Sequence, residues 1–354
     1  MREEVGADYD KELQIADLAG RTTLDIIGLT GMDCDFHTLQ DPGNELHHQY
    51  HSITGGDRPW SAKLLFLLGM VTSAHRLMMK VPTKFNRQLL GASAVIRGVA
   101  RQVIRQKKEK LEAREQEGYN VDIVSVALGS GVFTEDNLVD QMMTFLGAGH
   151  ETTSAALQWA VYYLSRYQDV QARLRDEVRA NLPPISPENA GEGSISAAAI
   201  DSLPYLNAVC NEVFRFRPPV RNLMRVSARD TMLVGVPIPK GTIIVFSPEI
   251  FNHEKSFWGA DADEFNPDRW MRPGCANTGG AVSNYAMLTF IHGPRSCIGQ
   301  GFAKSELACM IATLVGRFHI QANDAGTDTS YIDTGITIKP KDGALTHFTP
   351  LEGW

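Results

Sequence analysis

The sequence predicts a mainly α-helical protein of the α+β class, with small β-sheets in its second half. Apolar residues recur at helical spacing through most of the chain, beginning with residues 9–29. Strand-like alternation is confined to residues 226–247, where Gly235 and Gly241 mark hairpin turns. No internal repeat and no sharp change in composition divides the 354 residues. We therefore predict a single domain over residues 1–354.

The composition is that of an ordinary globular protein, because 43% of the residues are apolar and 21% are charged. The formal net charge is -7 and the basic residues are scattered, so we predict no nucleic-acid partner. The five cysteines form no CxxC pair, which favours a reducing compartment. The longest apolar run, residues 64–71, is shorter than the roughly 20 residues of a spanning helix. It predicts a buried core helix and no transmembrane segment in this chain.

The remaining local patterns predict one more long helix and two loops. Residues 83–116 form an amphipathic pattern whose last third carries charge pairs at four-residue spacing, so we expect that third to be solvated. Residues 181–194 and 271–286 are rich in loop-forming residues and are predicted to be flexible. Three histidines lie close together in "ELHHQYH", but no partner ligands accompany them. For these residues, His47, His48 and His51, we expect a solvated loop or helix rather than a metal site.

A buried helix is predicted to begin at Thr134, whose side chain can cap it and whose following acidic residues suit the positive end of the helix dipole. Apolar residues occupy every face of this helix, so it should cross the core. Residues 147–153 place two glycines and several polar side chains inside it. Each glycine costs about 1 kcal/mol relative to alanine there, so the segment requires an explanation.

Several explanations for residues 147–153 can be compared. A zinc protease needs HExxH, but Ser154 stands where the second histidine would be. A phosphate-binding loop places its glycines before a helix, whereas these lie within one. A helix kink with satisfied polar groups remains open. So does the approach of a flat group to the glycines, with Glu151 and Thr152 beside it to handle protons.

A charged pair follows in "NEVFRFRPPVRNLMR". Glu212 and Arg215 are three residues apart, so they share one helix face, and their apolar neighbours favour an inward orientation. A surface ion pair is the alternative for any isolated ExxR sequence. Pro218 and Pro219 should end this helix. Arg269 lies further along in the aromatic and proline-containing segment "FNPDRW".

The segment "FIHGPRSCIG" places Cys297 in a glycine-containing loop just before a helix. Backbone amides and the helix dipole favour a thiolate at this position. A nucleophilic cysteine would need a histidine base with an orienting group, and His292 has no evident one. A zinc site would need further ligands at suitable spacing, and an inert buried cysteine would leave Arg295 unexplained. What remains is a thiolate that is the sole protein ligand of heme iron.

Four segments resemble, in order, the motifs of the cytochrome P-450 family. "AGHETT", residues 148–153, resembles the AGx(D/E)TT motif of the family's central helix. Glu212 and Arg215 resemble the ExxR pair, and residues 265–270 resemble the FxPxRW segment. Residues 290–299 match the FxxGxRxCxG heme loop. The resemblance is to eukaryotic microsomal members. It implies that the family's N-terminal helices, membrane anchor and part of its main sheet are absent from this chain.

The resemblance implies roles for individual residues. Cys297 would be the axial ligand of heme b, and Arg295 and Arg225 would pair with its propionates. Thr152 and Glu151 would be the catalytic alcohol and acid, while Glu212, Arg215 and Arg269 would hold the heme loop. Further cofactor-binding positions would be Phe290, Gly293, Gly299 and Ala148. The substrate pocket would include Met142, Phe145, Leu146, Val220, Leu223 and Ile336.

The resemblance also implies an activity. The chain would be a monooxygenase that inserts one oxygen atom from O2 into a hydrophobic substrate in secondary or lipid metabolism. Electrons would come from NADPH through a flavoprotein reductase, with cytochrome b5 as a further donor. The full-length parent would lie at the cytoplasmic face of the endoplasmic reticulum membrane. The alternatives are a non-catalytic heme-protein fragment and a heme-thiolate isomerase or dehydratase. The presence of Glu151 and Thr152 argues against an isomerase or dehydratase.

Overall fold

The computed structural model describes residues 12–54, 56, 60, 64, 81–113, 122–184, 195–323 and 330–354. Helices dominate this part of the chain, and the strands form small sheets in which β2–β5, β3–β4, β6–β9 and β7–β8 pair antiparallel. This confirms the predicted mainly α class. Contacts divide the chain into two compact units. Unit 1 comprises residues 1–13, 156–329 and 344–354, and unit 2 comprises residues 14–155 and 330–343. The prediction of one domain stays a prediction.

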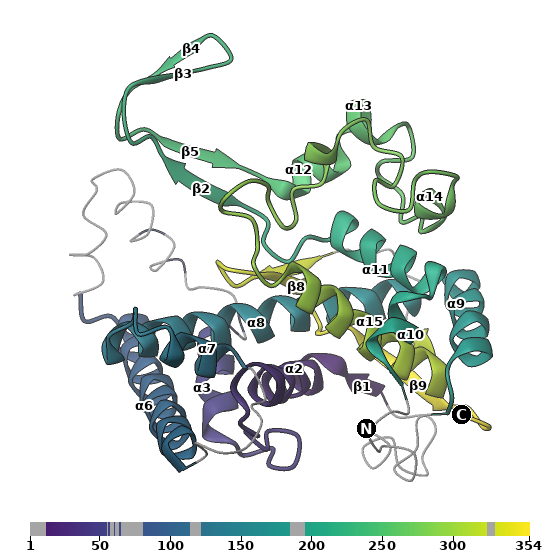
Figure 1. Cartoon of the computed structure of the whole chain (residues 1–354). Helices are drawn as coiled ribbons and strands as arrows, with labels where there is room; N and C mark the ends of the chain where they lie inside the picture. Colours follow the sequence, from purple (N-terminus) through teal and green to yellow (C-terminus); the bar gives the residue numbers. More distant parts are fainter. Residues whose placement is uncertain are drawn as a thin grey trace. The chain divides into compact units, whose positions relative to one another are not determined.

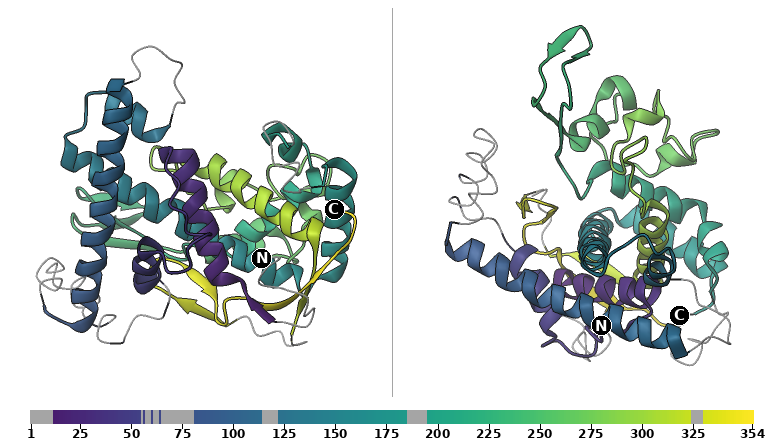
Figure 2. Two further views of the ribbon diagram at one scale, coloured as in Figure 1. Left: turned by 90° about the horizontal axis from the view of Figure 1, so that it is seen from below. Right: turned by 60° about the vertical axis from the view of Figure 1, so that its left-hand side comes forward.

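Unit 2 consists mainly of helices that pack against one another. Its elements are α2 (Ile15–Met32), α3 (Glu45–Thr54), α6 (Lys84–Ala113), α7 (Ile123–Gly129), most of α8 (Glu135–Leu164), β7 (Tyr331–Asp333) and β8 (Ile338–Pro340). Helix α3 contacts both α2 and α6, the long blue helix of Figures 1 and 2, and α7 contacts α2 and α6. After α2 the chain turns back closely, and a Cβ at Gly28 would lie 2.5 Å from the carbonyl oxygen of Cys34. Glycine is therefore required at this position.

Unit 1 is arranged around α11. Its helices are the end of α8, α9 (Gln168–Asn181), α10 (Ala197–Asp201), α11 (Pro204–Phe216), α12 (Pro248–His253), α13 (Lys255–Trp258), α14 (Asp268–Met271), the 3-10 helix η2 (Asn284–Ala286) and α15 (Gln300–Arg317). Helix α11 contacts α9, α10, α12, α14 and α15. It begins with proline at its first position, where no backbone donor is lost, and ends before Pro218 and Pro219 as predicted.

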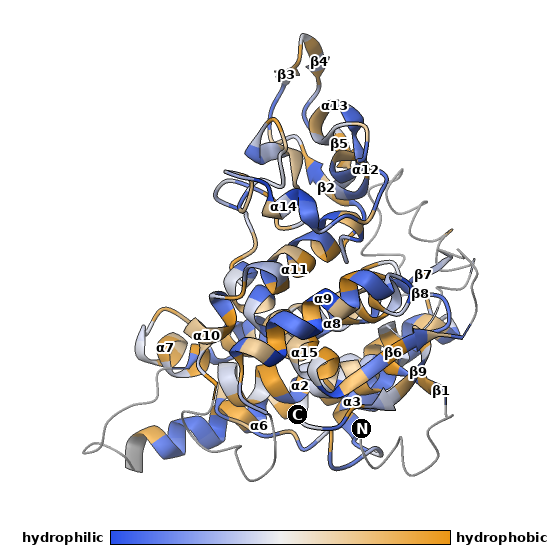
Figure 3. Cartoon of the chain, turned by 90° about the vertical axis from the view of Figure 1, so that its right-hand side faces the viewer, coloured by the Kyte–Doolittle hydropathy of each residue, from blue (hydrophilic) through white to orange (hydrophobic). Residues whose placement is uncertain are grey.

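The strands of unit 1 form a three-stranded sheet, in the order β1-β9-β6, and the two-stranded pairs β2–β5 and β3–β4. They are β2 (Leu223–Val226), β3 (Thr231–Leu233), β4 (Val236–Ile238), β5 (Ile243–Phe246), β6 (Phe318–Ala322) and β9 (Leu345–Pro350), and β1 (Glu12–Gln14) spans the unit boundary and pairs with β9. β6 follows α15 and is buried on one face. The β3–β4 hairpin, which confirms the predicted strand segment, carries apolar residues, drawn in orange in Figure 3. Its apolar side chains are exposed, and Val234 at the turn is 97% exposed.

Helix α9 and the end of the chain fix the C-terminal part of α15. Arg179 donates from Nε and Nη2 to the carbonyl oxygen of Gly316, at 2.9 and 2.8 Å. The indole of Trp354 covers the same residue, and a Cβ at Gly316 would lie 2.1 Å from the ring. Any side chain at this position would therefore displace the tryptophan.

Local predictions along the chain were mostly confirmed. Asn137 N donates to Thr134 Oγ1 at 3.3 Å, so Thr134 caps α8. The predicted helix over residues 83–116 is α6, but its last third is not wholly solvated. Lys107 is buried there and pairs with Asp122 at 2.5 Å and Asp33 at 3.0 Å. The side chain reaches two acidic residues distant in sequence, which the four-residue spacing could not indicate.

The predicted loops and the apolar run fall partly outside the described residues. Residues 185–194 and 65–71 lie outside them. Residues 271–286 form hydrogen-bonded turns followed by η2, and Gly279 N donates to the carbonyl oxygen of Cys275 at 2.7 Å. Among the helices that the structure describes, none combines the length and apolar character needed to cross a bilayer.

The histidine cluster lies on α3, which agrees with the helix that was one of the two predicted alternatives, a loop or a helix. His48 and His51 are exposed, but the expectation of solvation is wrong for His47, which is buried with Nε2 2.8 Å from Asp17 Oδ1. The hydrogen bond with His47 is the largest cause that lowers the pKa of Asp17 to about 2. Within the described part of the chain, no group of acidic, histidine and cysteine side chains is arranged to hold a metal ion.

Lys107→Met should lower the free energy of unfolding by about 3 kcal/mol, because it leaves the buried Asp122 carboxylate without its cation. Chemical denaturation measures this value. The matched control is Lys108→Met, at a side chain that is 41% exposed and pairs with the exposed Glu135. The control should leave the unfolding midpoint unchanged. Equal effects of the two substitutions would contradict the burial argument.

Candidate active site

Residues 148–152 of α8 present a small side chain and a hydroxyl on one helix face. Ala148 is exposed and Thr152 is half-buried, and a spacing of four residues puts them on the same side. Thr152 Oγ1 donates to the carbonyl oxygen of Ala148 at 2.8 Å. The hydroxyl keeps its lone pairs for another donor, so this face combines open space with one polar group.

His150 and Glu151 point into unit 2 rather than along that face. His150 is buried, its Nδ1 lies 2.6 Å from the carbonyl oxygen of Leu146, and its ring meets Tyr50 edge-on with centroids 4.5 Å apart. Burial lowers the pKa of His150, so the ring is neutral and structural. Glu151 is also buried, and its Oε1 accepts from Thr337 Oγ1 at 2.7 Å.

Lys339 completes the surroundings of Glu151. Its Nζ lies 2.8 Å from Glu151 Oε1, and only 14% of its side chain is exposed. Thr337 and Lys339 belong to the β7–β8 hairpin. Thr337 lies 186 residues after Glu151 in the sequence. Sequence reasoning missed both residues, because no local pattern connects a threonine and a lysine near the end of the chain to α8.

The predicted pocket residues of unit 2 have different surroundings. Met142 and Phe145 line an apolar cavity of about 440 Å³ between α7 and α8. Phe145 lies seven residues before Thr152, hence on the same helix face. Leu146 is fully buried. Ile336 is 50% exposed, in the turn between β7 and β8.

In unit 1, Glu212, Arg215 and Arg269 meet with side chains that are 0% exposed. Arg215 donates from Nε and Nη2 to the two carboxylate oxygens of Glu212, at 2.9 and 2.8 Å. Arg269 Nε donates to Glu212 Oε1 at 3.2 Å, and Trp270 Nε1 donates to Glu212 Oε2 at 2.9 Å. The structure therefore places the pair inside the protein, and the alternative of a surface ion pair is excluded.

The remaining donors of Arg215 fix the chain between α12 and α14. Nη1 donates to the carbonyl oxygens of Asn252 at 2.7 Å and Ala262 at 2.8 Å, and Nη2 donates to that of Glu264 at 2.8 Å. All five N–H groups of the guanidinium are thus used. The fork geometry of arginine is what allows one side chain to satisfy a carboxylate and three carbonyls together.

Asn252 connects Arg215 to the residues that precede the cysteine loop through hydrogen bonds. Its Nδ2 donates to the carbonyl oxygen of Arg215 and to Thr289 Oγ1, both at 2.9 Å, and its Oδ1 accepts from Leu288 N at 3.0 Å. Thr289 Oγ1 donates to the carbonyl oxygen of Phe214 at 2.7 Å. Sequence reasoning missed Asn252, because a single buried amide has no spacing signature.

The loop over residues 290–299 presents the sulfur of Cys297 to solvent. Cys297 N donates to the carbonyl oxygen of Phe290 at 2.8 Å, which closes the loop, and Gly293 has a φ of +82°. The Phe290 ring packs edge-on against Phe214 with centroids 4.9 Å apart. Helix α15 begins directly after Gly299, and a Cβ at Gly299 would lie 3.9 Å from Cys297 Sγ. The loop is thus anchored at Phe290 and open at the sulfur.

The other predicted cofactor-binding residues of unit 1 are exposed. Arg295 is exposed and makes no side-chain hydrogen bond or ion pair to the residues that the structure describes. Arg225, on β2, donates from Nη1 to the carbonyl oxygen of Met224 at 2.9 Å. Val220, which lies between α11 and β2, and Leu223, the first residue of β2, are half-buried. His292 Nε2 lies 3.1 Å from the carbonyl oxygen of Met287, and this contact gives no support to a role as a base for Cys297.

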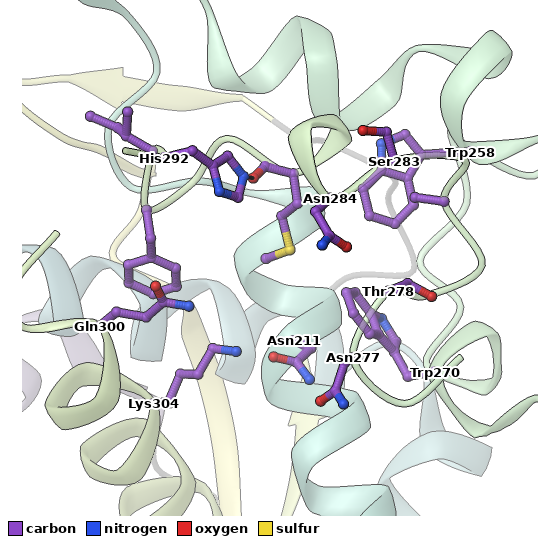
Figure 4. A pocket seen from close by; sticks show the side chains of 14 residues that line it. Asn211, Trp258, Trp270, Asn277, Thr278, Ser283, Asn284, His292, Gln300 and Lys304 are labelled. Carbon is purple, nitrogen blue, oxygen red and sulfur yellow. Dashed lines mark hydrogen bonds between the residues drawn. The ribbon is translucent and has the colours of Figure 1, made fainter. Parts of the chain in front are cut away.

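A polar cavity of about 290 Å³ lies beside the same loop. Figure 4 shows the carboxamides of Asn211, Asn277, Asn284 and Gln300 and the ammonium of Lys304 around it. Burial lowers the pKa of Lys304. The cavity is therefore lined by a partly buried lysine from the start of α15, which sequence reasoning did not anticipate.

The donors of the cysteine loop fit a heme group. Cys297 supplies one accessible sulfur, Ile298 beside it is 89% exposed, and Arg295 supplies a guanidinium that faces no internal carboxylate within the described residues. A flat apolar group that carries carboxylates and a metal would cover the isoleucine, pair with the arginine and accept the thiolate. The loop offers each complementary chemical group.

Comparisons with known proteins agree with this chemistry. The family model described as Cytochrome P-450 matches residues 1–347. The chain is 56% identical over 352 residues to the cytochrome P-450 monooxygenase sphH of Aspergillus fumigatus, which covers 98% of this chain and 63% of the relative. It is 40% identical to the cytochrome P-450 monooxygenase FSL4 of Gibberella zeae, over 97% of this chain and 62% of that protein. The chain thus spans somewhat less than two thirds of these relatives.

Arg215→Lys should lower the free energy of unfolding by about 3 kcal/mol or more, because lysine lacks the fork that satisfies Glu212 and three carbonyls. Arg272→Lys is the control, since its side chain is 53% exposed and it pairs with Asp261 alone among the acidic residues described. The control should change stability by less than about 1 kcal/mol. Thermal and chemical unfolding of both variants would measure the difference, and a stable Arg215→Lys protein would contradict the stated role.

Proposed function

Because the chain belongs to the cytochrome P-450 family, we propose that it acts as a heme-thiolate monooxygenase that hydroxylates a hydrophobic organic substrate with O2. Family membership implies heme b as the cofactor. The observation that supports the proposal most strongly is the exposed sulfur of Cys297 in a loop that is anchored to α11 through Asn252 and Phe290. An inert cysteine would not need this support.

Heme with a thiolate ligand supplies the chemistry that cleaves the O–O bond, because the thiolate pushes electron density to the iron. The chain's own residues bind and orient the group. Cys297 would ligate the iron, and Arg295 and Arg225 would hold the propionates. Phe290, Gly293 and Gly299 shape the loop, and a side chain at Gly299 would contact the sulfur.

Residues of α8 would manage protons. The Thr152 hydroxyl is held by the carbonyl of Ala148 and can still accept and orient a hydrogen bond from a neighbouring water or ligand. The small side chain of Ala148 leaves space on the same face. Glu151, the adjacent acid, would exchange protons with the solvent side through the polar groups that surround it.

Apolar residues would make up the substrate pocket. Phe145 and Met142 line the cavity beside α7, Ile336 is exposed on its hairpin, and Leu146 would support the wall from behind. Val220 and Leu223 would contribute from the segment after α11. Such a lining favours a hydrophobic substrate.

The partners and setting belong to the whole protein. NADPH would supply electrons through a flavoprotein reductase, with cytochrome b5 as a further donor. The fungal origin of the relatives supports a role in secondary metabolism, with lipid metabolism as the second setting. The full-length protein would lie at the cytoplasmic face of the endoplasmic reticulum membrane.

Cys297→Ser should abolish the strongly red-shifted Soret band of the reduced carbon monoxide complex, because an alcohol does not replace the thiolate ligand. Cys309→Ser is the control, since this cysteine is also exposed and lies on α15. The control should retain the band. A band that persists in Cys297→Ser would overturn the ligand assignment, and a wild-type chain that takes up no heme would favour the non-catalytic fragment.

Thr152→Ala should lower the product formed per NADPH by roughly 10-fold or more and raise peroxide release, because the positioned hydroxyl is lost. Thr144→Ala is the matched control: Thr144 lies on α8 and makes the same hydrogen bond, to the carbonyl oxygen of Asp140 at 2.8 Å. The control should keep the wild-type ratio. The measurement is the ratio of product to NADPH consumed in the reconstituted full-length enzyme. Tight coupling in Thr152→Ala would remove Thr152 from the relay.

A further inference from the structure

The carboxylate of Glu151 is held by the hairpin formed by β7 and β8. Its Oε1 accepts from Thr337 Oγ1 at 2.7 Å and pairs with Lys339 Nζ at 2.8 Å. The carboxylate is 6% exposed, so these two groups replace the water that would otherwise solvate it. Both partners come from the stretch 330–343, which belongs to the same compact unit as residues 14–155.

The turn between the two strands fixes the Thr337 hydroxyl. Thr334 N donates to the carbonyl oxygen of Thr337 at 3.0 Å, and Thr337 N donates to Thr334 Oγ1 at 3.0 Å. Both threonines are buried, each with 1% exposure. The reciprocal hydrogen bonds leave Thr337 little freedom, so its hydroxyl is preset to meet Glu151.

Lys339 is the cation that balances Glu151. Its ammonium also lies 3.4 Å from the carbonyl oxygen of Thr54, at the end of α3. Among the residues that the structure describes, Glu151 forms its ion pair with Lys339. Lys341, two residues later on the same hairpin, is exposed. Residues two apart in a strand share a face, so alternation does not separate the two lysines. β8 ends at Pro340, and Lys341 lies beyond it, whereas Lys339 lies within the strand and reaches Glu151.

We infer that Thr337 and Lys339 are positioning residues for Glu151, and that they couple the acid and alcohol of α8 to the hairpin that presents Ile336. Glu151 is adjacent to Thr152, and Thr337 is adjacent to Ile336, so the hydrogen bond between Thr337 and Glu151 links the two functional positions. A displacement of the hairpin by a ligand at Ile336 moves the groups that hold Glu151. The catalytic part of the inference rests on the proposed function.

Hydrogen exchange of the chain tests the coupling without turnover. Lys339→Met should accelerate amide exchange in residues 331–339 by at least about 10-fold, because the carboxylate is left buried without its cation. Lys341→Met is the matched control and should leave these rates unchanged. The double variant Glu151→Gln with Lys339→Met should exchange more slowly than Lys339→Met alone, since no uncompensated charge then remains. Equal rates in Lys339→Met and Lys341→Met would overturn the inference.

Turnover of the heme-loaded full-length enzyme tests positioning. Lys339→Met and Thr337→Val should lower the product formed per NADPH by about 3-fold or more, and Lys339→Arg should restore most of it. A merely structural role would reduce the amount of folded enzyme and leave this ratio intact. A wild-type enzyme without turnover would contradict the proposed function. The hydrogen-exchange result would still decide whether Lys339 links the hairpin to Glu151. If Lys339→Met formed as much product per NADPH as the wild-type enzyme, Lys339 would not be a positioning residue.

Discussion

One buried carboxylate, that of Glu212, sets the arrangement of unit 1. Two guanidinium groups and an indole N–H converge on it, with both arginine side chains fully buried. Burying these charges costs several kcal/mol per ion unless each finds partners of good geometry. The chain meets this demand by bringing four separate carbonyl and amide groups to Arg215 and Glu212, so the path of residues 252–266 follows from the need to give these buried charged groups their hydrogen-bond partners.

Unit 2 uses the same principle at a smaller scale. Glu151 is a buried carboxylate with one cation and one hydroxyl, whereas Glu212 has two cations. The smaller set leaves less redundancy, because loss of Lys339 removes the cation that pairs with Glu151 in the part of the chain that the structure describes. Glu212 and Glu151 therefore meet the cost of a buried charge in two ways, the first with two guanidinium groups and the second with an ammonium group and a hydroxyl.

Much of the fold could be predicted because its signals are local. The cap at Thr134, the common face of Glu212 and Arg215, and the hairpin glycines each depend on a few neighbouring residues. The cysteine loop was conspicuous because its glycines and arginine make little sense without a ligand. The motifs therefore located the candidate site.

The remaining features depend on distant contacts. Asn252 is indistinguishable from a surface amide until its three partners are known. Burial of His47 and Lys107 depends on Asp17 of α2, on Asp33 at the end of α2 and on Asp122 at the start of α7, all of which lie outside the helix of their partner. Lys339 and Lys341 both flank Pro340, and the ion pair of Lys339 with the distant Glu151, which no local pattern indicates, distinguishes the largely buried lysine from the exposed one.

The partners of Arg215 also bear on the order in which unit 1 is completed during synthesis. The carbonyl oxygens that accept from Arg215 lie 37, 47 and 49 residues after it, so α11 emerges from the ribosome well before these hydrogen-bond acceptors. Until then the charged end of α11 must remain in water, because burying it alone is unfavourable. The nascent helix is thereby kept from packing prematurely, and closure around it waits for the segment that precedes α14.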